Sequence, residues 1–282
     1  MGIDGIGRGG RPAQTTETRA PQAPVSPRPA AAESTNKASQ PGPVGDFFKD
    51  AFEKVKDGIE GIFGGGGGGA GGVGGGVGEV VQKVVQAAKD AQKLKDVKDI
   101  LADSPTGAAA VKYLEDKKIP VEFADGGGSY WDGNKIVIDR SQDPQEAALT
   151  LVHEVNHAKA SIDGPKADIV NDTRGDYVQK MLDEEVRGTV DSIKAKNELV
   201  ANGKNVTASF PLEKEYNDAY KQAVKDAKKK DPDLTDEQLR AIGEKAGYDA
   251  VLDGFKTGKV VTSTNGQTYP EYYGSAWDSA HP

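Results

Sequence analysis

The chain has 282 residues, no cysteine and a net charge of −8 at pH 7. The lack of cysteine excludes disulfides and cysteine metal ligands, and the negative charge argues against nucleic acid as the main partner. No apolar stretch approaches the roughly 20 residues of a transmembrane helix, so no transmembrane segment is expected.

Residues 1–45 are rich in proline, alanine, serine, threonine and arginine, and contain almost no large apolar side chains. Such a segment cannot bury enough apolar surface to offset the entropy lost on folding, so the composition predicts a disordered leader. No apolar run follows the first arginines, which is not the pattern of a secretory signal peptide.

Residues 46–102 are predicted to form two amphipathic helices joined by a glycine-rich tract over 64–78. The first helix alternates charged residues with large apolar ones (Phe47, Phe48, Phe52, Val55 and Ile59), and the second covers about 79–101. The helices could form a hairpin, lie on a membrane surface or pack on the following domain. Acidic residues balance the lysines, unlike in basic membrane-surface helices, so docking or self-association is the favoured interpretation.

Residues 103–282 are expected to make one domain of ordinary size. A Ser-Pro pair begins a helix over 104–117. A strand is predicted over 118–123, and a hairpin over 129–139 turns at an Asp-Gly-Asn sequence. Helices and a small sheet in this order indicate an α+β fold.

The next helix begins at a capping box made by Asp143 as the N-cap, Pro144 at the first position and Glu146 at the third. Gly164-Pro165 is expected to end it. Its apolar residues predict a core face that leaves the opposite side turned away from the core (Ala148, Leu151, Val152 and Val155).

That opposite side carries His153, Glu154 and His157, an H-E-x-x-H motif. Positions i and i+4 lie on one face of a helix, so both imidazoles can bind one metal ion while Glu154 contacts a water held on that ion. A chance match is expected in about one chain in a thousand of this composition, which makes the motif a strong signal.

The order of helix, strands and motif helix resembles the N-terminal subdomain of the zincin metallopeptidase superfamily, over residues 104–201. The resemblance is specific at the motif. It implies a zincin-like α+β domain over 103–282, one Zn²⁺ per chain bound by His153 and His157, and a sheet edge that holds an extended substrate. A catalytic zinc site usually has a third protein ligand.

Glu185 is the favoured third ligand. It lies within the apolar stripe of a helix predicted over 173–201, where a carboxylate is costly unless it is paired or bound to metal. The segment resembles the E-x-x-A/S-D pattern of the gluzincin branch, but Gly188 and Thr189 occupy its last two positions.

Two other carboxylates are alternatives to Glu185. Asp163 fits an H-E-x-x-H-x-x-G-x-x-D pattern, except that Ala160 stands where glycine is expected and favours a continuing helix. Glu184 precedes the favoured ligand and projects to one side of the apolar stripe.

In such a site, zinc lowers the pKa of bound water and polarises the scissile carbonyl, and Glu154 acts as general base and then general acid. A tyrosine is expected to stabilise the oxyanion, without a choice among five (Tyr216, Tyr220, Tyr269, Tyr272 and Tyr273). Aromatic packing is nevertheless the favoured interpretation of the cluster over 269–273. Three carboxylates are candidates to orient the histidine rings (Asp176, Asp183 and Asp191).

The rest of the domain is predicted to be mostly helical. Helices are expected over about 210–230 and 235–255. A final strand pair is expected to begin at 259–262 and to turn at Asn265-Gly266.

The predicted function is a zinc-dependent endopeptidase acting on a protein substrate. The layout resembles that of bacterial effector or toxin metallopeptidases, which implies delivery independent of a signal peptide and contact of the N-terminal region with secretion machinery or another partner; otherwise the protein is cytoplasmic. The alternatives are a non-catalytic metal-binding module and a zinc amidase acting on cell-wall peptide.

Overall fold

The computed structural model describes residues 74–164, 166–262 and 265–282. The predicted leader and the first amphipathic helix lie outside these residues. The helices are α2 (Gly74–Leu101), α3 (Pro105–Lys117), α4 (Pro144–Ile162), α5 (Arg174–Ala201), α6 (Glu213–Lys230), α7 (Asp236–Lys256) and α8 (Tyr269–Ala280), and the strands are β1 (Val121–Ala124), β2 (Tyr130–Trp131) and β3 (Ile136–Asp139). The described part is mostly helical with one small sheet, so the predicted α+β class is confirmed.

The sheet has the order β1-β3-β2, with β1 parallel and β2 antiparallel to β3. The predicted hairpin is confirmed, and the Asp132 side chain accepts hydrogen bonds from the main-chain N–H groups of Asn134 and Lys135 within its turn. The first strand begins at Val121 rather than at 118, because Lys118 adopts a left-handed conformation (φ 55°) that ends α3. The strand β2 has two residues and lies at one edge of the sheet.

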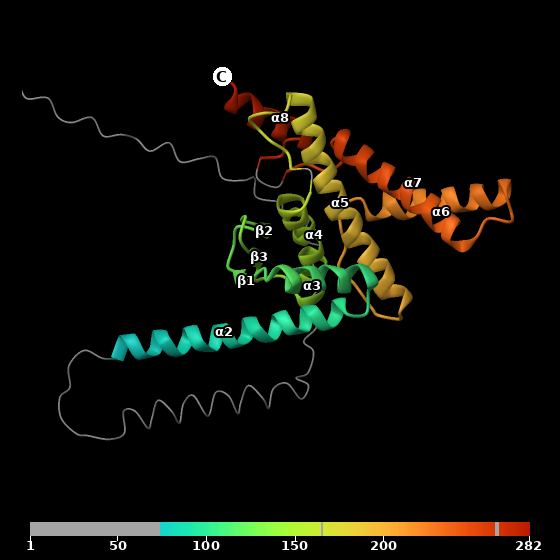
Figure 1. Cartoon of the computed structure of the whole chain (residues 1–282). Coiled ribbons are helices and arrows are strands. Elements are labelled where there is room, and N and C mark those ends of the chain that lie inside the picture. Colours follow the sequence, from blue (N-terminus) through green and yellow to red (C-terminus); the bar gives the residue numbers. More distant parts are fainter. Residues whose placement is uncertain (1–73, 165, 263–264) are drawn as a thin grey trace, which may run out of the picture.

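Helix α4 lies at the centre of the molecule, between the sheet on one side and α5 on the other (Figure 1). Its predicted capping box at Asp143 and Glu146 is confirmed, and the helix ends at Ile162. The prediction that its histidine side turns away from the core is wrong: His153 is 9% exposed and His157 is 7% exposed. The helix is buried all round because α5 covers the face that carries the motif.

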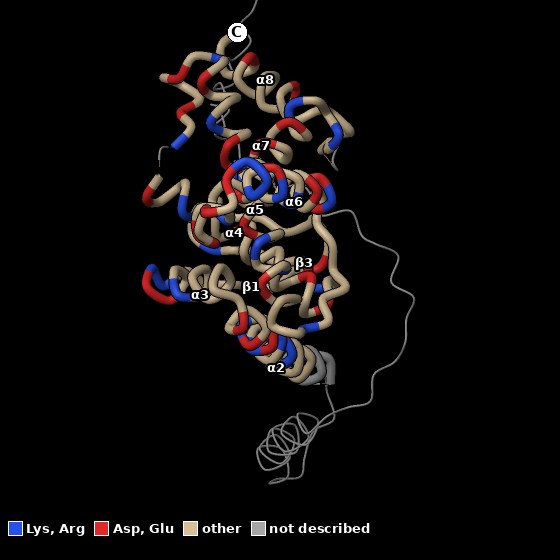
Figure 2. The backbone as a smooth tube through the Cα atoms, turned by 90° about the vertical axis from the view of Figure 1, so that its right-hand side faces the viewer, with Lys and Arg blue, Asp and Glu red and all other residues tan. Residues whose placement is uncertain are grey.

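Helix α2 packs on the following domain, one of the three arrangements expected for it. It begins at Gly74, inside the glycine tract, rather than at Glu79. Val97 and Leu101 belong to the core beneath α3 and α4, and the Lys93 ammonium donates to the carbonyl of Arg140 at 2.8 Å. Figure 2 shows both signs of charge interspersed along α2. None of the described helices is long and apolar enough to cross a membrane.

Two clusters of buried residues form the core. The first lies between α2, α3, the sheet and α4, and the second lies between α5, α7 and α8, with Tyr216 of α6. Helix α5 contributes to both. Helices α6 and α7 form a hairpin that projects to one side (Figure 1). The predicted strand pair near the C-terminus is wrong: a single bridge joins Val261 and Thr268, and the chain then enters α8 through a capping box at Thr268 and Glu271.

Candidate metal centre

Side-chain hydrogen bonds hold α4, the helix that carries the motif, against α5. Ser192 donates from Oγ to the carbonyl of Leu149 at 2.8 Å, and Asn156 donates to Asp191 Oδ2 at 3.0 Å. Between these contacts Gly188 lies directly against the His153 ring, where an added Cβ would be 2.8 Å from Nδ1. The position therefore requires glycine.

Three ligand atoms converge between the two helices. His153 Nε2 lies 3.1 Å from His157 Nε2 and 3.4 Å from Glu185 Oε2, and His157 Nε2 lies 3.9 Å from Glu185 Oε1. All three residues are buried, and this group could hold a metal ion. The structure thus brings together both motif histidines and Glu185, the residue favoured as the third ligand.

Two of the three separations are close to those expected around a tetrahedral ion, and the third, from His157 to Glu185, is longer. Ligand atoms about 2.0–2.1 Å from a tetrahedral zinc are about 3.3–3.4 Å from one another. The separations of 3.1 and 3.4 Å bracket that value. Glu185 Oε2 is also buried without a hydrogen-bond partner, although a buried carboxylate oxygen normally has one. A cation bound among the three residues would satisfy this oxygen.

The second nitrogen of His157 is held by Glu184. Nδ1 lies 2.6 Å from Glu184 Oε1, so the ring can donate there while Nε2 faces the cluster. The prediction that Asp176, Asp183 or Asp191 orients a motif histidine is wrong: their side-chain partners are Thr173, Gln179 and Asn156. Glu184 takes that place because consecutive residues of a helix point about 100° apart, so α5 can reach both sides of one imidazole.

Tyr273 is the tyrosine that joins the centre. Its hydroxyl donates to Glu185 Oε1 at 2.5 Å, from the buried face of α8. Burial and the charge of Glu185 hold the pKa of Tyr273 well above its ordinary value, so the hydroxyl keeps its proton. Tyr269 packs edge-on against Phe255, so the predicted aromatic packing of residues 269–273 is confirmed. The same segment also contacts the centre, through Tyr273. Tyr216 and Tyr220 instead stack on each other in the α6–α7 hairpin.

Glu154 lies beside the ligand cluster and is 2% exposed. One hydrogen bond reaches its carboxylate from the main-chain N–H of Trp131 in β2, whereas Oε2 has no partner. Burial raises the pKa of Glu154, against the opposing effect of His157 and His153. A carboxylate with a raised pKa and an unpaired oxygen is suited to accept a proton.

The centre concentrates negative charge. Glu154, Glu184 and Glu185 lie around two histidines, and among the described residues neither Glu154 nor Glu185 is paired with a lysine or arginine. Burial alone would lower the pKa of His157, but Glu185, Glu184 and Glu154 outweigh it and raise that pKa to about 10. Burial likewise acts to raise the pKa of Glu185, yet His157, His153 and Tyr273 bring it below its ordinary value. Such a site favours a cation.

Asp163, the alternative third ligand, lies away from the centre. It accepts hydrogen bonds from Tyr113 Oη at 2.9 Å and from Lys117 Nζ at 2.6 Å, and its side chain is 48% exposed. The cause is the one expected from Ala160, because α4 continues through that residue instead of turning back.

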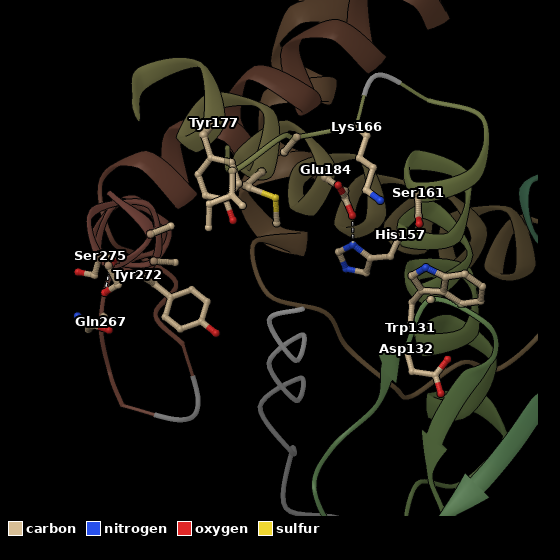
Figure 3. Close-up of a pocket in the computed structure, with 17 residues that line it drawn as sticks. Trp131, Asp132, His157, Ser161, Lys166, Tyr177, Glu184, Gln267, Tyr272 and Ser275 are labelled. Atoms are coloured by element: carbon tan, nitrogen blue, oxygen red, sulfur yellow. Dashed lines mark hydrogen bonds and ion pairs between the residues drawn. The ribbon is translucent and has the colours of Figure 1, made fainter. Parts of the chain in front are cut away.

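A cavity of about 700 Å³ opens beside the centre. His157 and Glu184 lie in its wall together with Trp131 of β2, and Tyr177 and Tyr272 lie across from them (Figure 3). His157 is the one residue of the ligand cluster that lines this cavity, so it connects the cluster to a space that a ligand can enter.

The sequence alone pointed to the two histidines and Glu185, which the structure brings together, and to Glu154 beside them. It did not predict three neighbouring contacts: of Trp131 with Glu154, of Glu184 with His157, and of Tyr273 with Glu185. A signal existed for Glu184, since it adjoins the favoured ligand on the same helix. Trp131 and Tyr273 are brought to the centre by the packing of β2 and α8, and no spacing in the sequence records those contacts.

No protein-family model matches this chain, and no curated protein or solved structure is significantly similar to it.

Proposed function

We propose that this protein is a zinc-dependent endopeptidase that hydrolyses peptide bonds of a protein substrate. The observation that carries the proposal is the convergence of His153 Nε2, His157 Nε2 and Glu185 Oε2 next to Glu154, whose own Oε2 is unpaired. Two imidazoles and one carboxylate are a donor set of catalytic zinc sites, which leave a fourth position for water or substrate.

Zinc, when bound, supplies a Lewis acid for the scissile carbonyl and lowers the pKa of water. Glu154 is assigned as the general base that takes a proton from the attacking water and delivers it to the leaving amine. The N–H of Trp131 fixes one side of this carboxylate, which leaves Oε2 for the proton. Burial raises the pKa of Glu154, which favours uptake of that proton by its carboxylate.

Two further residues position the ligands. Glu184 holds His157 with Nε2 directed to the cluster, and Tyr273 holds Glu185 through Oε1, so Oε2 stays available. Contacts of this kind fix the orientation of metal ligands and raise the basicity of a ligand histidine.

The arrangement around the centre supports a zincin-like assignment. An antiparallel edge strand, β2, lies beside the motif helix, and it contacts the proposed base through Trp131. An extended peptide can add to such an edge through main-chain hydrogen bonds. This placement favours a polypeptide substrate over a small molecule.

The test compares metal content and proteolysis in the full-length wild-type protein, Glu154→Gln and Glu185→Ala. Glu154→Gln should retain zinc but lose cleavage by at least about a hundredfold, because it removes proton transfer and leaves the ligands. Glu185→Ala should lose both. The matched control is Glu244→Gln, since Glu244 pairs with Lys194 on another part of α5.

Zinc is measured by mass spectrometry of the purified protein, and cleavage by labelling new N-termini in a mixture of cellular proteins. Failure of the wild type to bind added zinc would overturn the proposal. Cleavage that persists in Glu154→Gln would overturn the assigned base. Zinc binding without any new N-terminus would leave a metal-binding module.

A further inference from the structure

Helix α2 is apolar on different sides in its two halves. In the C-terminal half, Val97 and Leu101 face the domain and are buried in the first core. In the N-terminal half, four apolar residues make a separate outer stripe: Val81, Val84, Ala88 and Ala91. At about 100° per residue, the outer stripe is turned by about 140° from the face with Val97 and Leu101. The outer stripe therefore points away from the domain.

The outer stripe is not part of either core. Among the residues that the structure describes, none of its four members belongs to a hydrophobic cluster or packs against one. Val84 is 43% exposed. The domain-facing side of the same half is polar, and Asp90 accepts hydrogen bonds there from Arg140. Figure 1 shows this half of α2 extending past the sheet. The outer stripe is thus an apolar helix face that is left for an occupant beyond the described residues.

The outer stripe has the repeat of a coiled coil. Its members follow one another after three, four and three positions, which is the spacing of the a and d positions of a heptad. Residues 46–63, which lie outside the described part, carry a second repeat with the same spacing: Phe52, Val55, Ile59 and Ile62. Two such repeats in one chain can pair as an antiparallel helical hairpin.

The two repeats also complement each other in size. When a positions of one helix face d positions of the other in antiparallel order, Phe52 faces Ala91 and Val55 faces Ala88. Ile59 and Ile62 then face the two valines of the outer stripe. Large residues opposite small ones fill the space between two helices well. Pairing with the outer stripe of a second copy would instead place valine against alanine at every level, with less side-chain volume.

The chain between the two repeats is long enough for the turn. Helix α2 begins at Gly74, which is about 10 Å along its axis before Val81. Packed helices lie about 8–10 Å apart, so the connection must span about 14 Å. Residues 64–73 include eight glycines. A glycine-rich chain of ten residues has an average end-to-end distance of about 17 Å. Such a short tether gives an effective concentration in the millimolar range, which favours pairing within one chain.

We propose that residues 46–63 cover the outer stripe of α2 in the same chain, as the first helix of an antiparallel hairpin. The C-terminal half of α2 anchors this hairpin on the domain through Val97 and Leu101. The N-terminal half binds the first amphipathic segment. The pairing does not depend on the proposed peptidase activity.

Because the chain has no cysteine, introduced thiols report on the pairing directly. Full-length Val55→Cys/Ala88→Cys places two thiols at the same level of the hairpin. The matched control, Val55→Cys/Gln86→Cys, places the second thiol on the domain-facing side of α2. Mild oxidation followed by peptide mapping should show an intramolecular disulfide in most chains of the first variant, and at least about tenfold less in the control. Equal yields in the two variants, or a disulfide that forms only between chains, would overturn the hairpin.

Amide hydrogen exchange provides a second test without cysteine. In the full-length wild type, exchange over residues 46–63 should be at least about tenfold slower than over residues 1–45. Ala88→Glu places a charge in the pairing face and should remove this protection. Gln82→Glu, the matched control, adds the same charge on another side of α2 and should leave the protection unchanged. Exchange in α4 should be the same in both variants, because the domain core is not altered.

Three results would overturn the pairing. The first is a wild type without protection over residues 46–63, and the second is protection that Ala88→Glu leaves intact. The third is protection that depends on another occupant. Protection that appears only as the protein concentration is raised would assign the outer stripe to a second copy. Protection that appears only with vesicles of equal parts phosphatidylcholine and phosphatidylglycerol would assign it to a lipid surface.

Discussion

The two cores of this protein differ in the kind of residue that fills them. The first, between α2, α3, the sheet and α4, is almost entirely aliphatic, and Phe123 is the one aromatic residue among its buried members in the described part of the chain. The second, between α5, α7 and α8, buries five aromatic rings: Tyr177, Tyr216, Phe255, Tyr269 and Tyr273. Four of those rings bring a hydroxyl into the interior, and one of these hydroxyls reaches the metal centre.

The difference shows where the chain places polar chemistry. An aliphatic core can only bury surface, whereas a tyrosine core can bury surface and also offer donors to neighbouring carboxylates. Helix α4 supplies the first core with Leu149, Leu151 and Val155, and it presents His153 and His157 toward α5. The candidate metal centre therefore lies at the boundary between the two cores, where the aliphatic core supports the histidines and the aromatic core positions Glu185.

The largest predicted loss of stability should come from Leu101→Ala, which changes the aliphatic core and leaves the aromatic core intact. Leu101 is 0% exposed at the end of α2 and lies in the aliphatic core, so truncation should cost about 2–5 kcal/mol of unfolding free energy. Zinc affinity of the folded variant should be unchanged, since the site lies at the far side of α4. Urea unfolding and a zinc chelator competition measure the two quantities.

Val84→Ala is the matched control, because Val84 is 43% exposed on the same helix. If Leu101→Ala costs no more than this control, α2 is not part of the folded domain in solution.

The aliphatic core was largely predictable from the sequence, and the aromatic side of the centre was not. Periodicity, caps and turn residues predicted α3, α4 and α5, and the burial of Ala148, Leu151 and Val155 on one face of α4. These are local properties of the chain. The contacts of Tyr273 with Glu185 and of Glu184 with His157 depend on how α8 and α5 dock, over separations of 88 and 27 residues.

The next largest predicted effect concerns the protonation of His157 and its consequence for zinc binding. His157 in the metal-free protein has a pKa raised from 6.5 to about 10. Its charged form therefore stabilises the metal-free fold fully below about pH 6.5, and this contribution is lost as the pH rises through about 10. Zinc needs the neutral imidazole and must displace this proton.

Apparent zinc affinity should therefore rise about tenfold per pH unit between about pH 7 and 9, the slope for release of one proton. Calorimetry in buffers of different ionisation enthalpy counts the protons directly. A flat affinity over this range, with no proton released, would show that His157 is already neutral.

On the aromatic side, Tyr273→Phe should have a smaller effect on zinc binding. It removes the donor to a buried carboxylate, for which about 1.5–3 kcal/mol of unfolding free energy is expected in the metal-free protein. Zinc affinity should fall about tenfold, the lower end of the range for residues that orient a metal ligand. By linkage, saturating zinc should then stabilise Tyr273→Phe by about 1.4 kcal/mol less than it stabilises the wild type.

Tyr220→Phe is the matched control, since Tyr220 stacks on Tyr216 away from the centre. An equal loss of zinc affinity in both variants would mean that the Tyr273 hydroxyl has no particular role.

The smallest effect should follow Asp163→Ala, and it decides between the two ligand sets that the motif allows. Asp163 is nearly half exposed, and its partners are Tyr113 and Lys117 of α3. Hydrogen bonds from Lys117 and then from Tyr113 lower the pKa of Asp163. Its carboxylate is therefore already paired at the protein surface, next to the aliphatic core. Surface ion pairs contribute little to stability. Zinc content should therefore equal that of the wild type, while Glu185→Ala loses the metal. A reversed pattern, with zinc lost only in Asp163→Ala, would require α4 to unwind at Ala160 and would place the third ligand on the aliphatic side.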